Sequence, residues 1–391
     1  MESSRVSIAL DEPLARRAPR SAAPRQMVTT EIVSPQLWDR TIAQFDEVCQ
    51  EQLYTFARNR WPGVGHEPVL FWRGGEVIGG SLMMIQPLPF RLSALAVAKW
   101  GPMLARTDHP NRSDLYAGMI DALVAEYADR RRLMLSVLPR ASLSPFNADY
   151  DHLTHRGFSR GSELGFPNRY IVNLRLSDDE QRASFEQKWR YHLKKSEKAG
   201  LGFEHAPASR FPEFAALYEK MLDRKRFADH SAYDTVHELM KVENEALRPE
   251  LFFVRHTGEI IAGAIIFKAG DRAVYLYGAT NDRALPLRAG YFMHWHIIRW
   301  LRDNTRANWY DLGGTDGFHG LHQFKKGMVG DKGVIRPVPP VANYASARWA
   351  GFVGRSAFLA RDIVENVKRE LGKLRADRAR PDQKRDADSG E

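Results

Sequence analysis

One pattern occurs twice in this chain of 391 residues, and it constrains the fold more than any other feature. Residues 69–81 read V-L-F-W-R-G-G-E-V-I-G-G-S, and 183 positions later residues 252–264 read F-F-V-R-H-T-G-E-I-I-A-G-A. Each copy joins two apolar runs through a Gly-Glu turn, which predicts a β-hairpin with Gly75 or Gly258 in the turn. Such a return at a fixed offset indicates a duplicated unit.

The segments after each hairpin also match. In both halves a strand-like run rich in β-branched or aromatic residues is followed by a helical pattern and then by a second strand-like run. The predicted strand, helix and strand are Leu95–Trp100, Asp114–Arg130 and Leu133–Leu138 in the first half, and Ala273–Gly278, Ala289–Asn304 and Asn308–Gly314 in the second. We therefore predict an α/β fold with layered helices and strands, in two tandem units at residues 28–165 and 166–340.

The remaining segments and the composition exclude several classes of protein. Hydrophobic residues make up 43% of the chain, which is ordinary for a globular protein, and the single cysteine, Cys49, excludes a disulfide framework or a zinc ribbon. No apolar run approaches the roughly 20 residues of a membrane span. We expect a cytoplasmic protein with a disordered arm at 1–27, an amphipathic helix at 341–375 and a disordered tail at 376–391. The helix docks on its own domain or lies on a membrane surface.

Positive charge is concentrated between the two hairpins. The chain has 57 Lys and Arg against 48 Asp and Glu, and residues 182–198 hold six basic side chains, Lys195 among them, against two acidic ones. Arg224 and Arg226 form a second cluster. These side chains suit the phosphates of a nucleotide, a lipid-linked pyrophosphate or a tRNA backbone, or they simply form a solvated surface. No DNA-reading motif accompanies them, so we expect no DNA partner.

Six short motifs, in this order, resemble one known family. They are K-W-G-P at 99–102, R-G-F at 156–158, W-R-Y-H-L-K-K-S-E-K-A-G at 189–200, Y-L-Y-G-A-T at 275–280, Y-D-L-G-G at 310–314 and G-L-H-Q-F-K-K-G at 320–327. Together they resemble the FemABX-type aminoacyltransferases, which are tandem-GNAT enzymes that build peptidoglycan cross-bridges and related lipid-linked peptides. The resemblance covers roughly residues 28–337.

The resemblance implies an acyltransferase that forms an amide bond. The implied donor is aminoacyl-tRNA, and the implied acceptor is a UDP- or lipid-linked muropeptide, which would bring the protein to the inner face of the membrane as a peripheral contact. The wider group also contains enzymes that use acyl-CoA on an amino sugar or small amine, so that reaction is the alternative. A third reading is a non-catalytic protein that binds an anionic or lipid-linked ligand. The oligomeric state stays open.

Two residues are the predicted catalytic pair. Amide formation needs stabilisation of a tetrahedral oxyanion and a destination for the amine proton. Lys325, just beyond the Gly-Gly that ends the last strand, is the first choice for stabilising the oxyanion or the leaving group. Asp311, at the end of an apolar strand, would orient that lysine or accept a proton; its structural alternative is to cap the next turn.

The remaining predicted site residues surround this pair. In the GNAT fold the loop before the second unit's helix receives the acyl donor, which assigns Arg288 and Gly290 to the donor site, although this loop has few glycines. Alternation along the strand puts Tyr275 and Tyr277 on one face, with Tyr277 lining the site and Tyr275 in the core. The predicted substrate-binding residues are Tyr277, Thr280, Arg224, Arg226, Trp189, Lys195, His319, Phe324 and Lys326. We expect no metal site.

Overall fold

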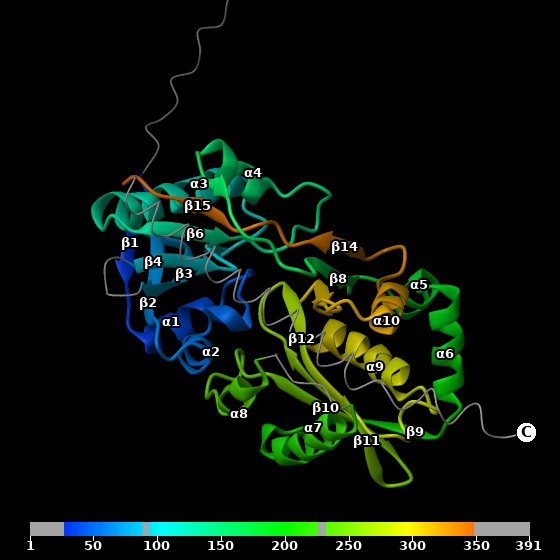
Figure 1. Ribbon diagram of the computed structural model, residues 1–391. Coiled ribbons are helices and arrows are strands. Elements are labelled where there is room, and N and C mark those ends of the chain that lie inside the picture. The colour runs from blue at the N-terminus through cyan, green and yellow to red at the C-terminus, as the bar shows by residue number, and fades with distance from the viewer. Residues whose placement is uncertain (1–26, 89–93, 226–231, 348–391) are drawn as a thin grey trace, which may run out of the picture.

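A computed structural model describes residues 27–88, 94–225 and 232–347. The chain forms two mixed sheets with helices packed on them, and in Figure 1 the sheets occupy an upper and a lower lobe. Both repeated hairpins are present at the predicted positions, β2 (Gly65–Arg73) with β3 (Glu76–Pro87) and β10 (Glu250–His256) with β11 (Glu259–Phe267). Gly75 and Gly258 have positive φ angles of 85° and 84°, as these turns require.

The first sheet has the strand order β1-β2-β3-β4-β6-β15-β7, with β5 paired to β3. Its other strands are β1 (Thr29–Ile32), β4 (Ala94–Lys99), β5 (Met103–Leu104), β6 (Met134–Leu138), β7 (Ser159–Arg160) and β15 (Ala342–Tyr344). Its helices are α1 (Pro35–Ile42), α2 (Tyr54–Arg60), α3 (Arg112–Leu123), which continues as a π-helical turn over Val124–Arg130, and α4 (Ala148–His155).

The second sheet has the order β14-β8-β13-β12-β11-β10-β9. Its other strands are β8 (Asn168–Asn173), β9 (Leu201–Ala206), β12 (Arg272–Thr280), β13 (Trp309–Asp311) and β14 (Val334–Pro337). Its helices are α5 (Asp178–Ser184), α6 (Gln187–Glu197), α7 (Phe211–Lys225), α8 (Val236–Leu239), α9 (Ala289–Asn304) and α10 (His319–Val329). Helix α9 has the predicted bounds.

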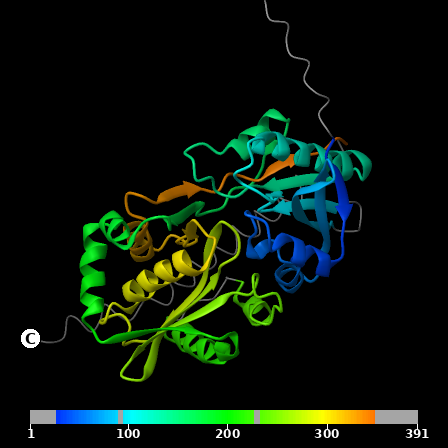
Figure 2. The same ribbon diagram turned by 180° about the vertical axis from the view of Figure 1, so that it is seen from behind.

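The end of the described chain differs from the sequence prediction. Residues 342–344 form strand β15 of the first sheet, between β6 and β7, whereas the sequence analysis begins the amphipathic helix at 341. The Pro339-Pro340 pair favours extended backbone ahead of this strand, and the buried amide oxygen of Asn343 accepts a 2.7 Å hydrogen bond from Ser136 Oγ. Figures 1 and 2 show this orange segment running from the lower lobe back to the upper one. The rest of that predicted helix, the arm at 1–26 and the tail lie outside the described residues.

The two units share a buried core. Trp38 and Met103 of the first unit pack in one cluster with Phe267 and Val274 of the second. Polar contacts add to it, since the Arg306 guanidinium donates to Asp46 Oδ1 at 2.9 Å and to the Phe45 carbonyl at 2.6 Å. One face of the second sheet therefore meets the first unit and α7, and the opposite face is covered by α6, α9 and α10.

Candidate functional site

The parallel strands of the second unit pair over a short distance and then separate. In β12, residues 272–274 pair with residues 309–311 of β13, and the last six residues of β12, 275–280, run on without β13 beside them. In the first unit the corresponding strands β4 and β6 pair from Leu95 with Met134 to Lys99 with Leu138. The second unit therefore has an opening in its sheet at a place where the first unit is closed.

Lys325 lies at this opening. It is 6% exposed, and its Nζ donates two 2.6 Å hydrogen bonds, to the carbonyl oxygens of Leu312 and Gly314 just beyond β13. Burial and, after it, the positive charge of Arg169 lower the pKa of Lys325 to about 8. The side chain is therefore a buried ammonium group at neutral pH, close to its deprotonation point.

Tyr275, and not Tyr277, faces Lys325. The lysine Nζ lies 5.9 Å from the Tyr275 ring centre, on the α9 side of the sheet. Tyr277 packs on the opposite face against Tyr233 near α7. The prediction that the two tyrosines share a face is wrong, because the pairing of β11 with β12 shifts register between Ile265 and Ile266. Such a bulge adds a residue to one strand and breaks the period of two.

Aromatic rings surround the opening on the α9 side. Phe324 packs edge-on against Tyr291 at 4.9 Å between ring centres and contacts Trp189 at 6.2 Å. Trp189 is 2% exposed, so this predicted substrate contact is a core residue of α6. His294 lies 4.9 Å from the Tyr275 ring, and burial, together with the charge of Lys325, lowers its pKa to about 3. This histidine is therefore neutral.

Three backbone amides at the start of α9 donate hydrogen bonds within the chain. The N–H of Ala289 donates to the carbonyl of Ala284, that of Arg288 to Leu285, and that of Tyr291 to Arg288. Arg288 adopts a left-handed conformation with φ of 59° at the start of the helix, and a Cβ added at Gly290 would lie 3.8 Å from the Phe324 ring. These amides therefore already donate hydrogen bonds inside the protein, whereas in a phosphate site they would donate to the phosphate oxygens.

Asp311 is held by Arg169 on the face of the sheet that meets the first unit. The Arg169 Nε lies 3.1 Å from Asp311 Oδ1, and the same oxygen accepts the Gly313 N–H at 2.9 Å, the turn-capping bond named as its structural alternative. Burial raises the pKa of this carboxyl, but the charges of Arg169 and Arg272 outweigh it and hold the pKa below its usual value. Asp311 is thus an ionised, engaged carboxylate, which is unsuited to accepting a proton near neutral pH.

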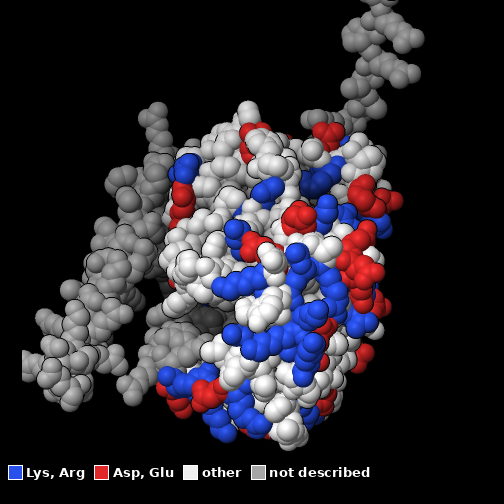
Figure 3. All heavy atoms as spheres, turned by 90° about the vertical axis from the view of Figure 1, so that its right-hand side faces the viewer, with Lys and Arg blue, Asp and Glu red and all other residues white. Residues whose placement is uncertain are grey.

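Exposed basic side chains gather on α6 and beside it, as the blue area in Figure 3 shows. Trp189, Leu193 and Ser196 form the buried stripe of α6, so its lysines point to solvent. We call the exposed basic residues of this helix the α6 basic face: Lys188, Arg190, Lys194 and Lys195. Lys326 of α10 is also exposed, and its Nζ lies 3.5 Å from a carboxylate oxygen of Glu186, the residue just before α6. His319, at the start of α10, is exposed as well.

The predicted residues near α7 lie away from Lys325. Arg224 donates to Asp282 Oδ1 at 2.6 Å and to the carbonyl of Thr280 at 3.0 Å, so it holds the turn that follows β12. Together with Tyr277 these residues belong to the α7 side of the sheet. Arg226 lies outside the described residues. The predicted site residues thus fall into two groups, one near Lys325 and α6, the other near α7.

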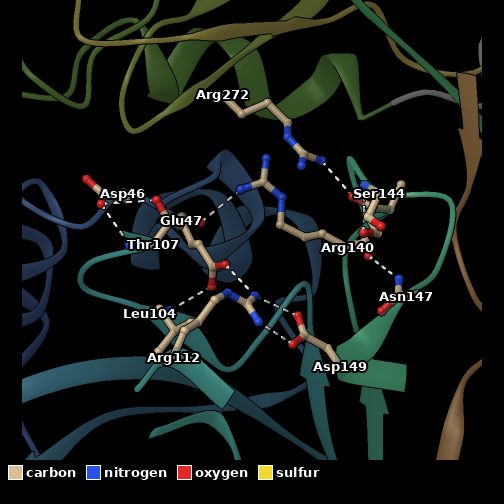
Figure 4. Close-up of polar contacts among 12 residues, drawn as sticks. Asp46, Glu47, Leu104, Thr107, Arg112, Arg140, Ser144, Asn147, Asp149 and Arg272 are labelled. Atoms are coloured by element: carbon tan, nitrogen blue, oxygen red, sulfur yellow. Dashed lines mark hydrogen bonds and ion pairs between the residues drawn. The ribbon is translucent and has the colours of Figure 1, made fainter. Parts of the chain in front are cut away.

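A pocket between the two units contains arginines that the sequence analysis missed. Arg140 follows β6 of the first unit, and Arg169 and Arg272 come from β8 and β12 of the second; all three line the pocket with Asp311 and Glu51. Figure 4 shows the guanidinium groups of Arg140 and Arg272 near each other. The three arginines lie in separate segments of the sequence, so no local sequence pattern predicts that they form a cluster.

Hydrogen bonds fix the first-unit arginine in place. The Asn147 side-chain amide donates to the Arg140 carbonyl at 3.0 Å, and Arg140 Nη1 donates to the Glu47 carbonyl at 3.1 Å. Glu47 is itself held by the Leu104 N–H at 2.7 Å and by Arg112 at 3.1 Å (Figure 4). The pocket wall is therefore preorganised on the side of the first unit.

Within the described ranges, no helix is long and apolar enough to span a membrane. The same part of the chain holds no group of three or more His, Cys, Asp or Glu side chains placed to bind a metal ion.

The chain is similar in sequence and in structure to known proteins. Residues 183–326 match the acetyltransferase (GNAT) domain family. Over 131 residues the chain is 27% identical to lipid II:glycine glycyltransferase of Staphylococcus aureus, a match that covers 31% of this chain and 30% of that enzyme. The matched part therefore spans under a third of the curated relative.

Solved structures are similar over most of the chain. FemX is 18% identical with a TM-score of 0.65, covering 81% of this chain and 97% of FemX. The C-terminal domain of a putative lysylphosphatidylglycerol synthetase from Agrobacterium fabrum is 16% identical with a TM-score of 0.51, covering 83% of this chain and 98% of that domain. Together with the matched GNAT domain, these similarities confirm the tandem GNAT fold that the repeat and the family resemblance predict.

Proposed function

We propose that this chain, which resembles the FemABX-type family of tandem GNAT proteins, transfers an aminoacyl group from aminoacyl-tRNA to an amine of a cell-envelope precursor. The coarser statement, an acyltransferase of the GNAT type, follows from the matched domain and the fold. The donor and the acceptor are the proposal.

The observation that carries the proposal is the placement of Lys325 in the opening between β12 and β13. Its ammonium group has three N–H donors, and the carbonyls of Leu312 and Gly314 engage two of them. The third can meet a reacting oxygen. When the acceptor amine attacks the ester carbonyl, this donor would stabilise the oxyanion in a buried, low-dielectric place, where such a contact has a large effect on the barrier.

The reaction balances without a further reagent. The acceptor nitrogen forms a bond to the ester carbon, the carbon–oxygen bond to the ribose breaks, and the amine proton ends on the ribose hydroxyl. Lys325, with its pKa lowered to about 8, can both hold a proton at neutral pH and give it up readily to the leaving oxygen. In this scheme Asp311 fixes Arg169 and the turn at Gly313, so it is a positioning residue.

Two features support aminoacyl-tRNA as the donor. Three amides at the start of α9, those of Arg288, Ala289 and Tyr291, are already bonded within the chain, and the Phe324 ring lies close to Gly290. This leaves little of the usual cradle for a coenzyme A pyrophosphate. In addition, the α6 basic face and Lys326 present exposed cations next to the aromatic cluster around Lys325. A row of such cations suits a nucleic-acid backbone.

The proposed acceptor is a lipid- or UDP-linked peptide amine. One relative is named for adding glycine to lipid II, and the sequence motifs resemble the same family. An acceptor of that kind would be met in the cytoplasm or at the inner face of the membrane.

The alternative is acyl transfer from acyl-CoA to an amino sugar or small amine, which the match to the acetyltransferase (GNAT) domain favours. The third reading, a non-catalytic binding protein, would keep the fold but use no donor. The three possibilities differ in the acyl donor, which is aminoacyl-tRNA, acyl-CoA or none, so an assay of donor use separates them.

The test incubates the protein with tRNA charged with radiolabelled amino acids and with UDP-linked muropeptide or lipid II. Label is expected to pass into the acceptor, at a rate that falls strongly in Lys325→Ala and stays unchanged in Lys241→Ala. Lys241 is a matched control, because it is an exposed lysine on the far side of the second unit, paired with Glu238 at 2.9 Å.

Parallel reactions contain acetyl-CoA and an amino sugar, with release of free thiol as the readout. Thiol release without any transfer from charged tRNA would contradict the proposed donor and favour the acyl-CoA reading. Absence of turnover with every donor, together with retained ligand binding, would favour the binding protein.

A further inference from the structure

The pocket between the two units has an excess of positive charge. Its walls carry the guanidinium groups of Arg140, Arg169 and Arg272 and the carboxylates of Glu51 and Asp311. Arg169 is matched by Asp311 at 3.1 Å. With three cations against two anions, one positive charge in the pocket is left without a counter-charge from its own lining.

Within the described residues neither Arg140 nor Arg272 forms an ion pair with a carboxylate, although the charges of Asp311 and Glu47 act on Arg272 from farther away. The hydrogen bonds described for their side chains go to neutral carbonyl oxygens, from Arg140 to Glu47 at 3.1 Å and from Arg272 to Ala141 at 2.9 Å. Burial lowers the pKa of Arg272 to about 10, and the nearby charge of Arg140 contributes to the shift. Two like charges are thus held near each other at a cost, which a bound anion would relieve.

A neutral polar atom in the same pocket also lacks a partner. The side chain of Gln50 is 8% exposed, and within the described part of the chain its buried Oε1 accepts no hydrogen bond. Buried polar atoms are nearly always bonded, so this oxygen is available to a hydrogen-bond donor that enters the pocket. An amide oxygen of this kind would accept an N–H group.

We infer that this pocket binds the carboxy terminus of a peptide, with the terminal carboxylate between Arg140 and Arg272 and the adjacent amide N–H on Gln50 Oε1. A guanidinium group matches a carboxylate in shape and charge. The single excess charge favours a monoanionic carboxylate over a phosphate dianion. Naming this ligand as the peptide part of the acceptor rests on the proposed function; the binding itself does not.

The test uses small probes that separate the two contacts. N-acetylglycine carries both the carboxylate and the N–H, N-acetylglycinamide lacks the charge, and N-acetylsarcosine lacks the N–H. Binding to the full chain is measured by ligand-observed NMR titration. We expect N-acetylglycine to bind about tenfold to a hundredfold more tightly than the neutral amide, and measurably more tightly than the sarcosine compound. Equal binding of the acid and the amide would overturn the inference.

Two variants locate the site. Arg140→Gln and Arg272→Gln are each expected to weaken N-acetylglycine binding by about tenfold or more. Each substitution removes one of two like charges and also one hydrogen bond to a carbonyl oxygen, so the melting temperature of the free protein should change little. Unchanged binding in both variants would overturn the inference, as would a large loss of thermal stability, since the arginines would then be structural.

Inorganic phosphate is the competing probe. Displacement of N-acetylglycine by phosphate at a lower concentration than by acetate would overturn the carboxylate assignment in favour of a phosphate site. None of these measurements depends on turnover. Failure of the pocket therefore leaves the proposed reaction standing, and failure of the reaction leaves the binding result intact.

Discussion

The two units of this chain have the same order of elements but differ in the pair of parallel strands at the centre of each sheet. In the first unit β4 pairs with β6 along residues 95–99 of β4, and the short strand β5, which follows β4 in the chain, pairs with β3. The sheet is therefore closed at this place. In the second unit β12 and β13 pair over three positions, and the ammonium group of Lys325 bonds the carbonyls just beyond.

This difference shows how a duplicated fold can divide its tasks. In the first unit Arg140, just after β6, forms a wall of the pocket between the units. In the second unit, under the proposed function, a reacting group would enter the sheet beside Lys325.

Loss of the Lys325 ammonium group should affect turnover more than any other single change. Removal of one preorganised donor at an oxyanion costs about 10²–10³ in kcat, so we expect that loss for Lys325→Ala. Single-turnover transfer from charged tRNA measures it, with circular dichroism to verify the fold. Wild-type rates in this variant would place the chemistry elsewhere.

The shape of the opening depends on Gly278. A Cβ at this position would overlap the Tyr275 hydroxyl, so Gly278→Ala must displace that ring. We expect a loss of about 1–3 kcal/mol in the free energy of unfolding, the usual cost of overpacking, and slower transfer. Urea unfolding provides the measurement.

Gly202→Ala in β9 is the matched control, because an added Cβ there meets nothing within 4 Å. The control should change stability by less than about 1 kcal/mol. Equal effects of the two substitutions would mean that Tyr275 is free to move and that its position does not define the opening.

The rate of transfer should depend on the protonation of Lys325. Because its pKa is lowered to about 8, the ammonium form is present below that pH and is lost as the pH rises through it. We expect kcat to fall about fivefold between pH 8 and pH 9, as the protonated fraction does. A pH–rate profile checks this, and Lys325→Arg should remove the alkaline decline from whatever activity remains. A decline that persists in that variant would assign it to another group.

The smallest expected effect concerns the α6 basic face. Replacing Lys194 and Lys195 by alanine should weaken tRNA binding severalfold and reduce the slope of log K against log salt by about 1–2. A double variant with the same charge change, Lys220→Ala with Lys241→Ala, alters exposed lysines of α7 and of the turn after α8 and serves as control. An equal loss in both double variants would indicate a general effect of net charge.

Local patterns in the sequence predict the fold well. The hairpins, helix α9 and the strands on either side of it follow from hydrophobic periodicity and turn residues, which act over a few positions. The return of residues 342–344 to the first sheet does not follow from such patterns, since it depends on a free place between β6 and β7.

Local sequence patterns predict less of the site than of the fold. Lys325 stands out because it follows a glycine pair after the last strand of the repeat. The bulge at Leu276, which reverses the expected face of Tyr277, depends on pairing with β11 and has no signal in β12 itself. Arg140, Arg169 and Arg272 lie in three distant segments, and the docking of the two units alone brings them together.

The central claim is that the acyl group binds in the second unit, beside Lys325, and not in the first unit. The most direct measurement is photo-crosslinking with a stable aminoacyl amide of the tRNA 3′ end that carries a diazirine on its side chain, mapped by mass spectrometry. The account predicts adducts in β12 (Arg272–Thr280) or α10 (His319–Val329). Adducts confined to β4 (Ala94–Lys99) or β6 (Met134–Leu138) would contradict it.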